Sequence, residues 1–340
     1  MSSKESGRGS NTWMLVLAAG QGTRLSSLTT DANGLTVPKQ FCSLNGGPSL
    51  LHMAIGRART VVPSERICVV VAEEQRRWWR KSLAMLPPSN VLVQPRNRGT
   101  GMGILLALLC IMARDPEARI AFLPSDHYLS DEEVLARALE SAIGSLGRGS
   151  TEMILLGITP EEADPELGYV IPASSEGTAP ARVRQFVEKP PAPIAARLIE
   201  VGGLWNSFIF TANAIGLLQL FQRRHAETVT QMRAALDCPT VPQEVSSALR
   251  HLYRDLPTVD FSRHILESAA EWLRVSAVQR CGWSDLGTVP RVKRVVRELP
   301  EVQARANGRN ACFDLACAVR GNASAVPQPG DLAAARQLRR

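Results

Sequence analysis

The sequence contains no apolar run long enough to cross a membrane. Its longest uninterrupted nonpolar stretch, 104–113, has ten residues, whereas a transmembrane helix needs about 20. The first apolar run, 13–19, ends in glycines and Arg24 and lacks the length and the cleavage pattern of a signal peptide. These absences predict a cytoplasmic protein with no membrane span.

Cysteines at metal-binding or disulfide spacing are also lacking. The chain has seven cysteines, an odd number, and none of them forms a Cys-x-x-Cys pair. This pattern argues against a zinc ribbon and against a disulfide framework, and it predicts free thiols in a reducing compartment.

The chain has no stripe of basic residues interleaved with aromatic residues, the pattern typical of nucleic-acid-binding surfaces. Aromatic residues make up only 5% of the sequence, and 39 basic against 32 acidic residues give a net charge of +7 at pH 7. Part of the excess, at Arg336, Arg339 and Arg340, is read as a solvated tail. We therefore expect no nucleic-acid partner; the mild basic excess suits a phosphorylated small molecule.

What the sequence does contain is apolar material for a sizeable core, with 45% hydrophobic residues in 340. Continuous apolar runs, typical of strands buried on both faces, alternate through the first half with segments of helical spacing. This alternation predicts an α/β protein with a doubly wound, mixed but mostly parallel sheet and helices on both faces. The expected strands are 13–19, 67–72, 91–93, 119–123, 153–158, 183–187, 204–210 and 276–278, and the expected helices are 49–62, 73–86, 100–114, 131–146, 214–235 and 243–253.

These elements are assigned to one domain over residues 12–298. Residues 1–11 are polar and are expected to be a disordered N-terminal segment. Residues 299–340 have weak periodicity and are expected to be a partly disordered C-terminal extension. Because ligands bind at the carboxyl ends of strands in such sheets, the loops after Ala19, Val93 and Leu123 are the candidate sites.

The first of these loops reads Leu17-Ala-Ala-Gly-Gln-Gly-Thr-Arg-Leu25. Glycines at 20 and 22 allow a tight turn that brings backbone N–H groups against an anion, and Arg24 offers a planar fork to phosphate oxygens. Lys39, fourteen residues after Leu25, supplies a second cation. Leu25 stands where a dinucleotide fingerprint has its third glycine, and no Gly-Lys-Ser/Thr closes the loop, so neither a dinucleotide-binding fingerprint nor a P-loop is present.

Further motifs follow in a fixed order. They are Pro38-Lys39-Gln40-Phe41, Gln94-Pro-Arg-Asn-Arg-Gly-Thr-Gly-Met-Gly-Ile104, Leu123-Pro-Ser-Asp-His127, Gly168-Tyr169-Val170, Phe186-Val-Glu-Lys-Pro190, Trp205-Asn-Ser207 and Trp283-Ser-Asp-Leu-Gly-Thr288. The series covers about residues 13–295 and resembles the sugar-1-phosphate nucleotidyltransferases, in particular their mannose-1-phosphate guanylyltransferase branch. The resemblance implies a Rossmann-like nucleotidyltransferase fold.

The same resemblance implies that the protein transfers GMP from GTP to α-D-mannose 1-phosphate, giving GDP-mannose and pyrophosphate. The sugar phosphate attacks the α-phosphorus, and Mg²⁺ is the implied cofactor. Two polyanions must meet, which explains why such a site uses cations and a metal held by carboxylates. The implied catalytic residues are Arg24, Lys39, Asp126 and Asp285, of which Asp126 and Asp285 would share the metal.

The resemblance also implies the remaining binding residues. The expected nucleotide-binding residues are Ala18, Ala19, Gly20, Gly22, Thr23, Arg24, Lys39, Gln94, Arg98, Gly99 and Thr100. The expected sugar phosphate-binding residues are Gly168, Glu188, Lys189 and Asn206. The glycine-rich run 99–103 is expected to approach the base with its backbone, and the base is expected to be guanine.

Several of these residues also have structural readings. Asp126 alone reads as a turn residue after Pro124-Ser125, and Asn206 alone also reads as a turn residue. Asp260 reads as the N-cap of a helix through Ala270. We expect His127 to be a packed or hydrogen-bonded neighbour rather than a metal ligand, because no second histidine or cysteine lies at ligand spacing.

The chain departs from the family pattern in places. Gly99, Gly101 and Gly103 stand where the relatives more often have Asn or Asp and two alanines, and Leu167 replaces a tyrosine. Phe208 replaces the glycine of an Asn-Ser-Gly block, which predicts a reshaped sugar pocket. Longer bacterial relatives continue into a cupin-like isomerase domain, and we expect no such domain within these 340 residues.

Two alternatives remain open at this stage. One is a nucleotidyltransferase for another hexose 1-phosphate or another nucleoside triphosphate. The other is a catalytically silent regulator that binds nucleotide sugars, although retention of both phosphate cations and both carboxylates argues against silence. A homodimer is also left open.

Overall fold

The computed structural model describes residues 11–30, 34–147, 149–174, 179–236, 243–299 and 314–315. Within them the chain forms two compact units, each discontinuous in sequence. The first comprises the described residues of Met1–Ala19, Ile55–Pro124 and Leu129–Trp283; the second comprises those of Gly20–Ala54, Ser125–Tyr128 and Ser284–Arg340. The predicted terminal segments 1–11 and 299–340 lie almost entirely outside the described residues, and the expectations for them stay predictions.

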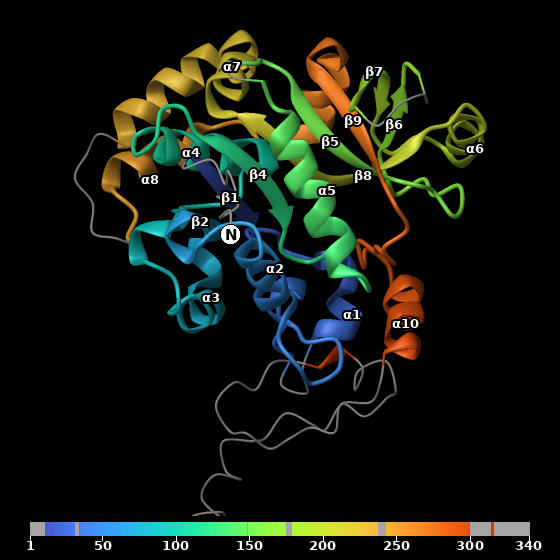
Figure 1. Ribbon diagram of the computed structural model, residues 1–340. Helices are drawn as coiled ribbons and strands as arrows, with labels where there is room; N and C mark the ends of the chain where they lie inside the picture. Colours follow the sequence, from blue (N-terminus) through green and yellow to red (C-terminus); the bar gives the residue numbers. More distant parts are fainter. Residues whose placement is uncertain are drawn as a thin grey trace, which may run out of the picture. The chain divides into compact units, whose positions relative to one another are not determined.

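A nine-stranded mixed sheet forms the centre of the first unit (Figure 1). Its strand order is β3-β2-β1-β4-β8-β5-β9-β7-β6. The strands are β1 (Thr12–Leu17), β2 (Ile67–Ala72), β3 (Val91–Gln94), β4 (Arg119–Pro124), β5 (Met153–Ile158), β6 (Tyr169–Pro172), β7 (Ala181–Val187), β8 (Leu204–Asn213) and β9 (Leu273–Val278).

The parallel character of the sheet is concentrated in its first half. β1 pairs in parallel with β2 and β4, and β2 pairs in parallel with β3. These strands are the continuous apolar runs of the sequence, and the sheet buries them almost completely. Beyond β4 the pairing changes, because β8 runs antiparallel to both β4 and β5, while β5 and β9 are parallel.

The start of β8 lies between two partners. Trp205 is paired with Ile158 of β5 and also with Tyr169 of β6. Farther along, the pairing with β5 shifts register at a bulge, and β8 then continues beside β4. β8 therefore connects the β6–β7 hairpin, which its first residues contact, to the main part of the sheet.

Helices cover the sheet of the first unit. α5 (Glu132–Ser145) packs on β4, β5, β8 and β9, whereas α4 (Gly99–Met112) packs on β1, β2 and β3 together with α7 (Ala214–Leu236). Figure 1 shows α5 in front of the sheet and α4 and α7 behind it. The remaining helices are α3 (Arg76–Ser82), α6 (Ala192–Glu200), α8 (Ser247–Asp255) and α9 (Phe261–His264).

The second unit has a small apolar core of its own. Its helices are α1 (Ser26–Thr29), the first turn of α2 (Leu50–Arg59) and α10 (Val289–Glu298). In α10, Val292, Val295 and Val296 recur at helical spacing and are buried against the core. The other core residues are Leu25, Cys42, Leu44, Leu50, Leu286 and Leu315.

Most of the expected strands and helices occur, with four additions and one correction. The additions are β6, α1, α6 and α10. Asp260 is indeed an N-cap, because its Oδ1 accepts a hydrogen bond from the Arg263 N–H at 3.1 Å. The predicted helix through Ala270 was wrong: α9 ends at His264 and two short 3-10 turns follow.

Candidate active site

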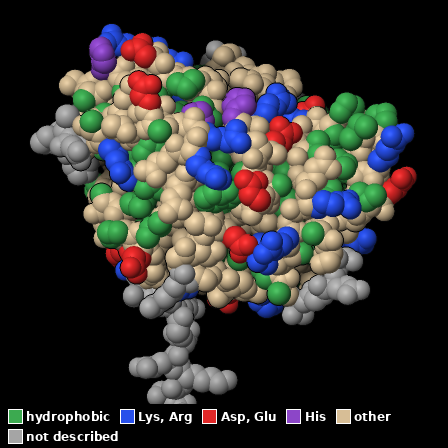
Figure 2. Space-filling view, turned by 90° about the horizontal axis from the view of Figure 1, so that it is seen from above, with side chains coloured by type: hydrophobic (Ala, Val, Ile, Leu, Met, Phe, Trp, Pro, Cys, Tyr) green, Lys and Arg blue, Asp and Glu red, His purple; other side chains and the backbone are tan. Residues whose placement is uncertain are grey.

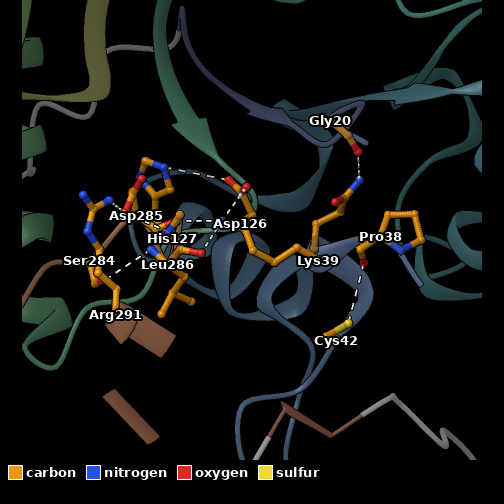
Figure 3. A network of polar contacts seen from close by, with 12 residues as sticks. Gly20, Pro38, Lys39, Cys42, Asp126, His127, Ser284, Asp285, Leu286 and Arg291 are labelled. Carbon is orange, nitrogen blue, oxygen red and sulfur yellow. Dashed lines mark hydrogen bonds and ion pairs between the residues drawn. The ribbon is translucent and has the colours of Figure 1, made fainter. Parts of the chain in front are cut away.

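Lys39 is a buried lysine whose ammonium group is surrounded by oxygen atoms (Figure 3). It begins the 3-10 helix Lys39–Phe41 and is 5% exposed. Its Nζ lies 2.9 Å from Oδ2 of Asp126, 2.6 Å from the carbonyl oxygen of Asp285 and 3.3 Å from that of Leu286. Because a buried ammonium group needs such partners, Lys39 ties the Asp126 side chain to the 285–286 backbone.

Asp126 is the first carboxylate of this group. Its side chain is 34% exposed, and the Nε2 atom of His127 lies 3.8 Å from its Oδ1. Partial burial is the largest influence on the Asp126 pKa and raises it, but the nearby Lys39 ammonium and His127 together outweigh burial and hold the pKa below its usual range. Asp126 is therefore ionised and keeps an accessible edge.

Asp285 is the second carboxylate, and it lies deeper. Its Oδ1 accepts hydrogen bonds from the Gly287 N–H at 2.9 Å and from the Arg291 guanidinium of α10. Burial raises the Asp285 pKa, the Gly287 N–H, Lys39 and Arg24 offset part of that rise, and the neighbouring Asp126 charge adds to it. The two carboxylates thus influence each other although 159 positions separate them in the sequence.

Arg291 is a residue that the sequence analysis missed. It contacts Asp285 from α10 and is largely buried, with 12% of its side chain exposed. The signal that could have indicated it was the valine spacing of Val292, Val295 and Val296, which predicts a helix directly after the Asp285 motif. We call Arg24, Lys39, Asp126, Asp285 and Arg291 the lysine cluster.

The glycine loop of the second unit also approaches Lys39. Gly22 has a φ of +63°, and a Cβ on it would lie 3.1 Å from the Lys39 backbone nitrogen, so a glycine suits this turn. Gly20 is fixed as well, since its carbonyl oxygen accepts a hydrogen bond from Gln40 Nε2 at 2.9 Å. Arg24, which is exposed, directs an Nη2 atom to within 3.2 Å of the point where a Gly287 Cβ would stand.

Asp126 and Asp285 are the two carboxylates of the lysine cluster that could hold a divalent metal. The described residues hold no group of three or more Asp, Glu, His and Cys side chains suited to a metal ion. Mg²⁺, however, commonly takes one or two carboxylates together with phosphate oxygens and water. Space beside the second carboxylate is kept clear, because a Cβ on Gly287 would lie 2.3 Å from Oδ2 of Asp285.

In the first unit, the predicted nucleotide loop is bound closely by the chain itself. The buried Gln94 side chain accepts a hydrogen bond from the Tyr253 hydroxyl at 3.4 Å. The Arg98 guanidinium donates to the carbonyl oxygens of Tyr253 and Arg254 near the end of α8, at 2.9 Å from Nε to Tyr253. The side chains of Gln94 and Arg98 are therefore engaged with the α8 region in this structure.

The backbone of the same loop has partners too. Asn97 links it to the β1 end, because its Nδ2 lies 3.3 Å from the Ala19 carbonyl oxygen while its Oδ1 accepts from the Gly99 N–H at 2.8 Å. At the β1 end itself, the Ala18 N–H donates to the Val70 carbonyl oxygen in β2 at 2.8 Å. Gly99 and Gly101 make their close approach to Val259 of the chain itself.

The four predicted sugar phosphate residues lie near one another in the first unit. A Cβ on Gly168 would lie 2.6 Å from Glu188 Oε2 and 3.3 Å from Asn206 Cβ, so Gly168 leaves room for both side chains. Lys189, with a φ of +50°, places its Nζ 4.0 Å from Glu188 Oε1. Their proximity follows from β6 and β8, which pair at Tyr169 and Trp205.

Glu188 is the buried carboxyl group of this region. Exposed charges of both signs are intermixed on the face seen in Figure 2, whereas the Glu188 side chain is only 10% exposed. Burial, with the charges of Asp260 and Glu267, raises the Glu188 pKa to about 7, although Lys189 and Arg263 offset part of the rise. We call Glu188, Lys189, Asn206, Asp260 and Glu267 the Glu188 cluster.

Phe208 adopts a glycine-like backbone conformation beside this cluster. Its φ is +57°, which non-glycine residues rarely adopt, and its N–H donates to Asn206 Oδ1 at 3.1 Å. Its ring packs edge-on against Phe210 and Phe261, with centroid distances of 6.0 and 6.2 Å. The ring is therefore held by an aromatic group.

Comparison with known proteins accounts for these motifs. The sequence profile of the Nucleotidyl transferase family matches residues 14–301, which is most of the chain. The chain belongs to the nucleotidyl transferase family. A crystal structure described as mannose-1-phosphate geranyltransferase from Thermus thermophilus is similar to this member, with a TM-score of 0.72, 28% identity, and coverage of 85% of this chain and 80% of the other.

Curated relatives of this nucleotidyl transferase include proteins of polysaccharide biosynthesis. The alginate biosynthesis protein AlgA of Pseudomonas putida is 28% identical over 280 residues, covering 80% of this chain and 56% of the relative. The mannose-1-phosphate guanylyltransferase of Salmonella muenchen is 26% identical over 291 residues, covering 81% and 57%. The chain thus spans little more than half the length of these relatives. Among the described residues, no helix is both long and apolar enough to pass through a membrane.

Proposed function

We propose that the protein transfers GMP from GTP to α-D-mannose 1-phosphate, releasing pyrophosphate. The observation that carries the proposal is the lysine cluster, where a buried ammonium group lies within 2.9 Å of an Asp126 oxygen and Asp285 is held by Arg291. Cations and carboxylates at such short range suit a reaction in which two phosphorylated substrates meet a metal ion.

The cations of the lysine cluster bind and orient the triphosphate. Arg24, which is exposed, holds the leaving β,γ-phosphates through its planar fork. Lys39 contacts oxygens near the α-phosphorus and stabilises the charge that develops there. Backbone N–H groups of the first loop, over residues 19–23, donate hydrogen bonds to the remaining phosphate oxygens.

The carboxylates of the lysine cluster hold Mg²⁺. Asp126, whose pKa lies below its usual range, is ionised at neutral pH and is a ready ligand. Asp285, whose pKa is raised by burial, gains a counterion that favours its ionised form. When bound, Mg²⁺ neutralises phosphate charge and orients the attacking oxygen. Arg291 positions the Asp285 carboxylate through Oδ1.

The Glu188 cluster binds the sugar phosphate. Lys189 holds the phosphate group, while Glu188 and Asn206 hydrogen-bond to sugar hydroxyls above Gly168. A carboxyl group with a pKa of about 7 can donate or accept such a hydrogen bond at neutral pH. The assignment of mannose rests on the relatives that are named for mannose 1-phosphate.

The base is proposed to be guanine, contacted by the loop that contains Gln94, Arg98, Gly99 and Thr100. The side chains of Gln94 and Arg98 have partners near α8. These two residues therefore contribute to base binding by holding the loop backbone in place. The product, GDP-mannose, would supply polysaccharide synthesis in the cytoplasm, in keeping with relatives named for alginate and xanthan biosynthesis.

Pyrophosphate release tests the function directly. The purified protein is incubated with Mg²⁺, with each of ATP, CTP, GTP, UTP and dTTP, and with mannose, glucose and galactose 1-phosphates. The expected result is release with GTP and mannose 1-phosphate first in rank. A clear preference for UTP or dTTP would overturn guanine, another preferred hexose would overturn mannose, and no release with any pair would overturn the enzymatic function.

A further inference from the structure

A four-residue segment of the first unit, Val259–Ser262, is bonded to the nucleotide loop through its backbone. The Val259 N–H donates to the Arg98 carbonyl oxygen at 3.0 Å, and the Val259 carbonyl oxygen accepts from the Gly101 N–H at 2.8 Å. The Phe261 N–H donates to Oγ1 of Thr100 at 2.9 Å. Three hydrogen bonds therefore hold the 259–262 segment against residues 98–101.

Glycines at 99 and 101 make this close approach possible. A Cβ on Gly99 would lie 2.3 Å from the Val259 carbonyl oxygen, and a Cβ on Gly101 would lie 2.6 Å from Val259 Cγ1. Real Cβ atoms do not approach other heavy atoms so closely, so any other residue at either position would displace the segment. The glycines at 99 and 101 thus serve contact with Val259 in this chain.

The opposite side of the 259–262 segment faces the Glu188 cluster. The Asp260 charge acts on Glu188, and the Ser262 hydroxyl accepts a hydrogen bond from Asn206 Nδ2 at 3.4 Å. The Phe261 ring stacks on Phe210 of β8 with a centroid distance of 5.4 Å and an interplanar angle of 13°. The segment is consequently in contact with β8 as well as with the nucleotide loop.

We propose that the 259–262 segment positions Glu188 and Asn206 for the sugar phosphate and that Gly101 and Thr100 act through it as positioning residues. The inference rests on the proposed function, because it concerns how that substrate is held. A displacement of about 1 Å in a positioned group can cost up to a hundredfold in rate. A change at residue 101 should therefore alter binding of the sugar phosphate although residue 101 does not contact that substrate.

The test is a rescue experiment on Gly101. Gly101→Ala should raise the KM for mannose 1-phosphate by about tenfold, within the range expected for a misplaced group, and should raise the KM for GTP by a smaller factor, because residues 99–103 are also expected to approach the base. Val259→Ala removes the Cγ1 atom that the new methyl group would meet at 2.6 Å and leaves the Val259 Cβ and carbonyl oxygen at 3.1 Å, so the double variant should recover part of the loss. The matched control is Gly144→Ala in α5, where a Cβ meets nothing within 4 Å and both KM values should stay unchanged.

A second pair of variants covers the case in which Gly101→Ala does not fold. Thr100→Val removes the acceptor of the Phe261 N–H and should raise the KM for mannose 1-phosphate, whereas Thr100→Ser keeps the hydroxyl and should restore it. A rise in the KM for GTP with no rise in the KM for mannose 1-phosphate would mean that Thr100 acts on the nucleotide alone, and it would overturn the inference. Equal rises in both KM values, or no rescue by Val259→Ala, would mean that the 259–262 segment has only a packing role. Either result would also overturn the inference. If the wild-type protein releases no pyrophosphate, the proposed function itself fails; the inference fails separately when the wild type is active and the variants behave otherwise.

Discussion

Asp126 of the lysine cluster and Glu188 of the Glu188 cluster have pKa values shifted in opposite directions. In the lysine cluster, Asp126 is paired with Lys39 at 2.9 Å and its pKa is lowered. In the Glu188 cluster, burial and two neighbouring carboxylates raise the Glu188 pKa to about 7, and Lys189 lies 4.0 Å away. Asp126 is ionised because Lys39 and His127 lie beside it. Glu188 stays partly protonated because Lys189 and Arg263 do not offset its burial and the neighbouring carboxylates.

This difference fits the ligands proposed for the two clusters. A site that binds polyphosphate and metal must present fixed charges, and ion pairs keep those charges in place before the ligand arrives. A site that binds neutral hydroxyl groups needs hydrogen-bonding atoms more than charge, so a carboxyl group poised near neutrality suffices. The predictions below separate the clusters by the kind of variant to which each responds.

The largest effect is expected from removing one negative charge in the lysine cluster. Asp126→Asn or Asp285→Asn keeps the shape of the side chain but removes a metal ligand, so kcat for pyrophosphate release should fall by at least about a hundredfold. The Asp285→Asn protein should fold and melt no lower than the wild type, because its buried carboxylate has a raised pKa. Asp255→Asn, an exposed carboxylate on α8, serves as the control. Near-wild-type turnover in both variants, or full activity in EDTA, would contradict the metal role.

A pH-dependent effect on stability is expected in the Glu188 cluster. The ordinary glutamate pKa is 4.5, and the folded protein raises it to about 7. Below the lower value the group is protonated in both the folded and the unfolded state. Between about 4.5 and 7 the unfolded chain releases the proton while the folded protein keeps it, so stability falls over this range, and the loss is complete once the pH has risen through 7.

Glu188→Gln mimics the protonated form and should remove that cost. Urea unfolding should show the variant to be more stable than the wild type by roughly 2 kcal/mol at about pH 8, with a much smaller gain at about pH 4. Glu140→Gln, an exposed change on α5, should show no such pH dependence. A gain that is the same at both pH values would mean that packing rather than ionisation is responsible.

Binding of the sugar phosphate should respond to Lys189. Lys189→Ala removes a charge-assisted contact worth about 1.5 kcal/mol, which corresponds to roughly a tenfold rise in the KM for mannose 1-phosphate. The KM for GTP should remain close to that of the wild type. Lys81→Ala on α3 removes an exposed lysine elsewhere and is the control. Equal losses for both substrates would indicate a folding defect instead.

The sequence predicts the parallel half of the sheet well because the signal is local there. Runs such as 67–72 are apolar without interruption, and only strands covered on both faces need that pattern. It also predicts that Lys39, Asp126 and Asp285 act together, since their motifs match a family pattern, and the fold of the second unit brings them into contact.

Contacts between distant segments are what the sequence cannot supply. The pairing of Tyr169 with Trp205 makes β6 a strand, although four residues carry too little periodicity to predict one. Arg291 reads as one more basic residue until α10 directs it to Asp285. Gly101 likewise reads as a departure from the family pattern until Val259 is seen beside it.

The smallest expected effect concerns Phe208, where two consequences of one substitution oppose each other. Phe208→Gly should relieve the left-handed backbone, worth about 1 kcal/mol, but it loses ring contacts with Phe210 and Phe261, each worth about 1 kcal/mol. Phe208→Ala loses the same contacts and keeps the strain, so it should unfold at lower urea concentration than Phe208→Gly. Both variants should retain kcat with GTP, because the lysine cluster is unchanged, while their selectivity among hexose 1-phosphates should broaden, since the ring lies two residues from Asn206. If Phe208→Ala is the more stable of the two, the positive φ imposes no strain; if selectivity does not change, Phe208 supports the aromatic group alone.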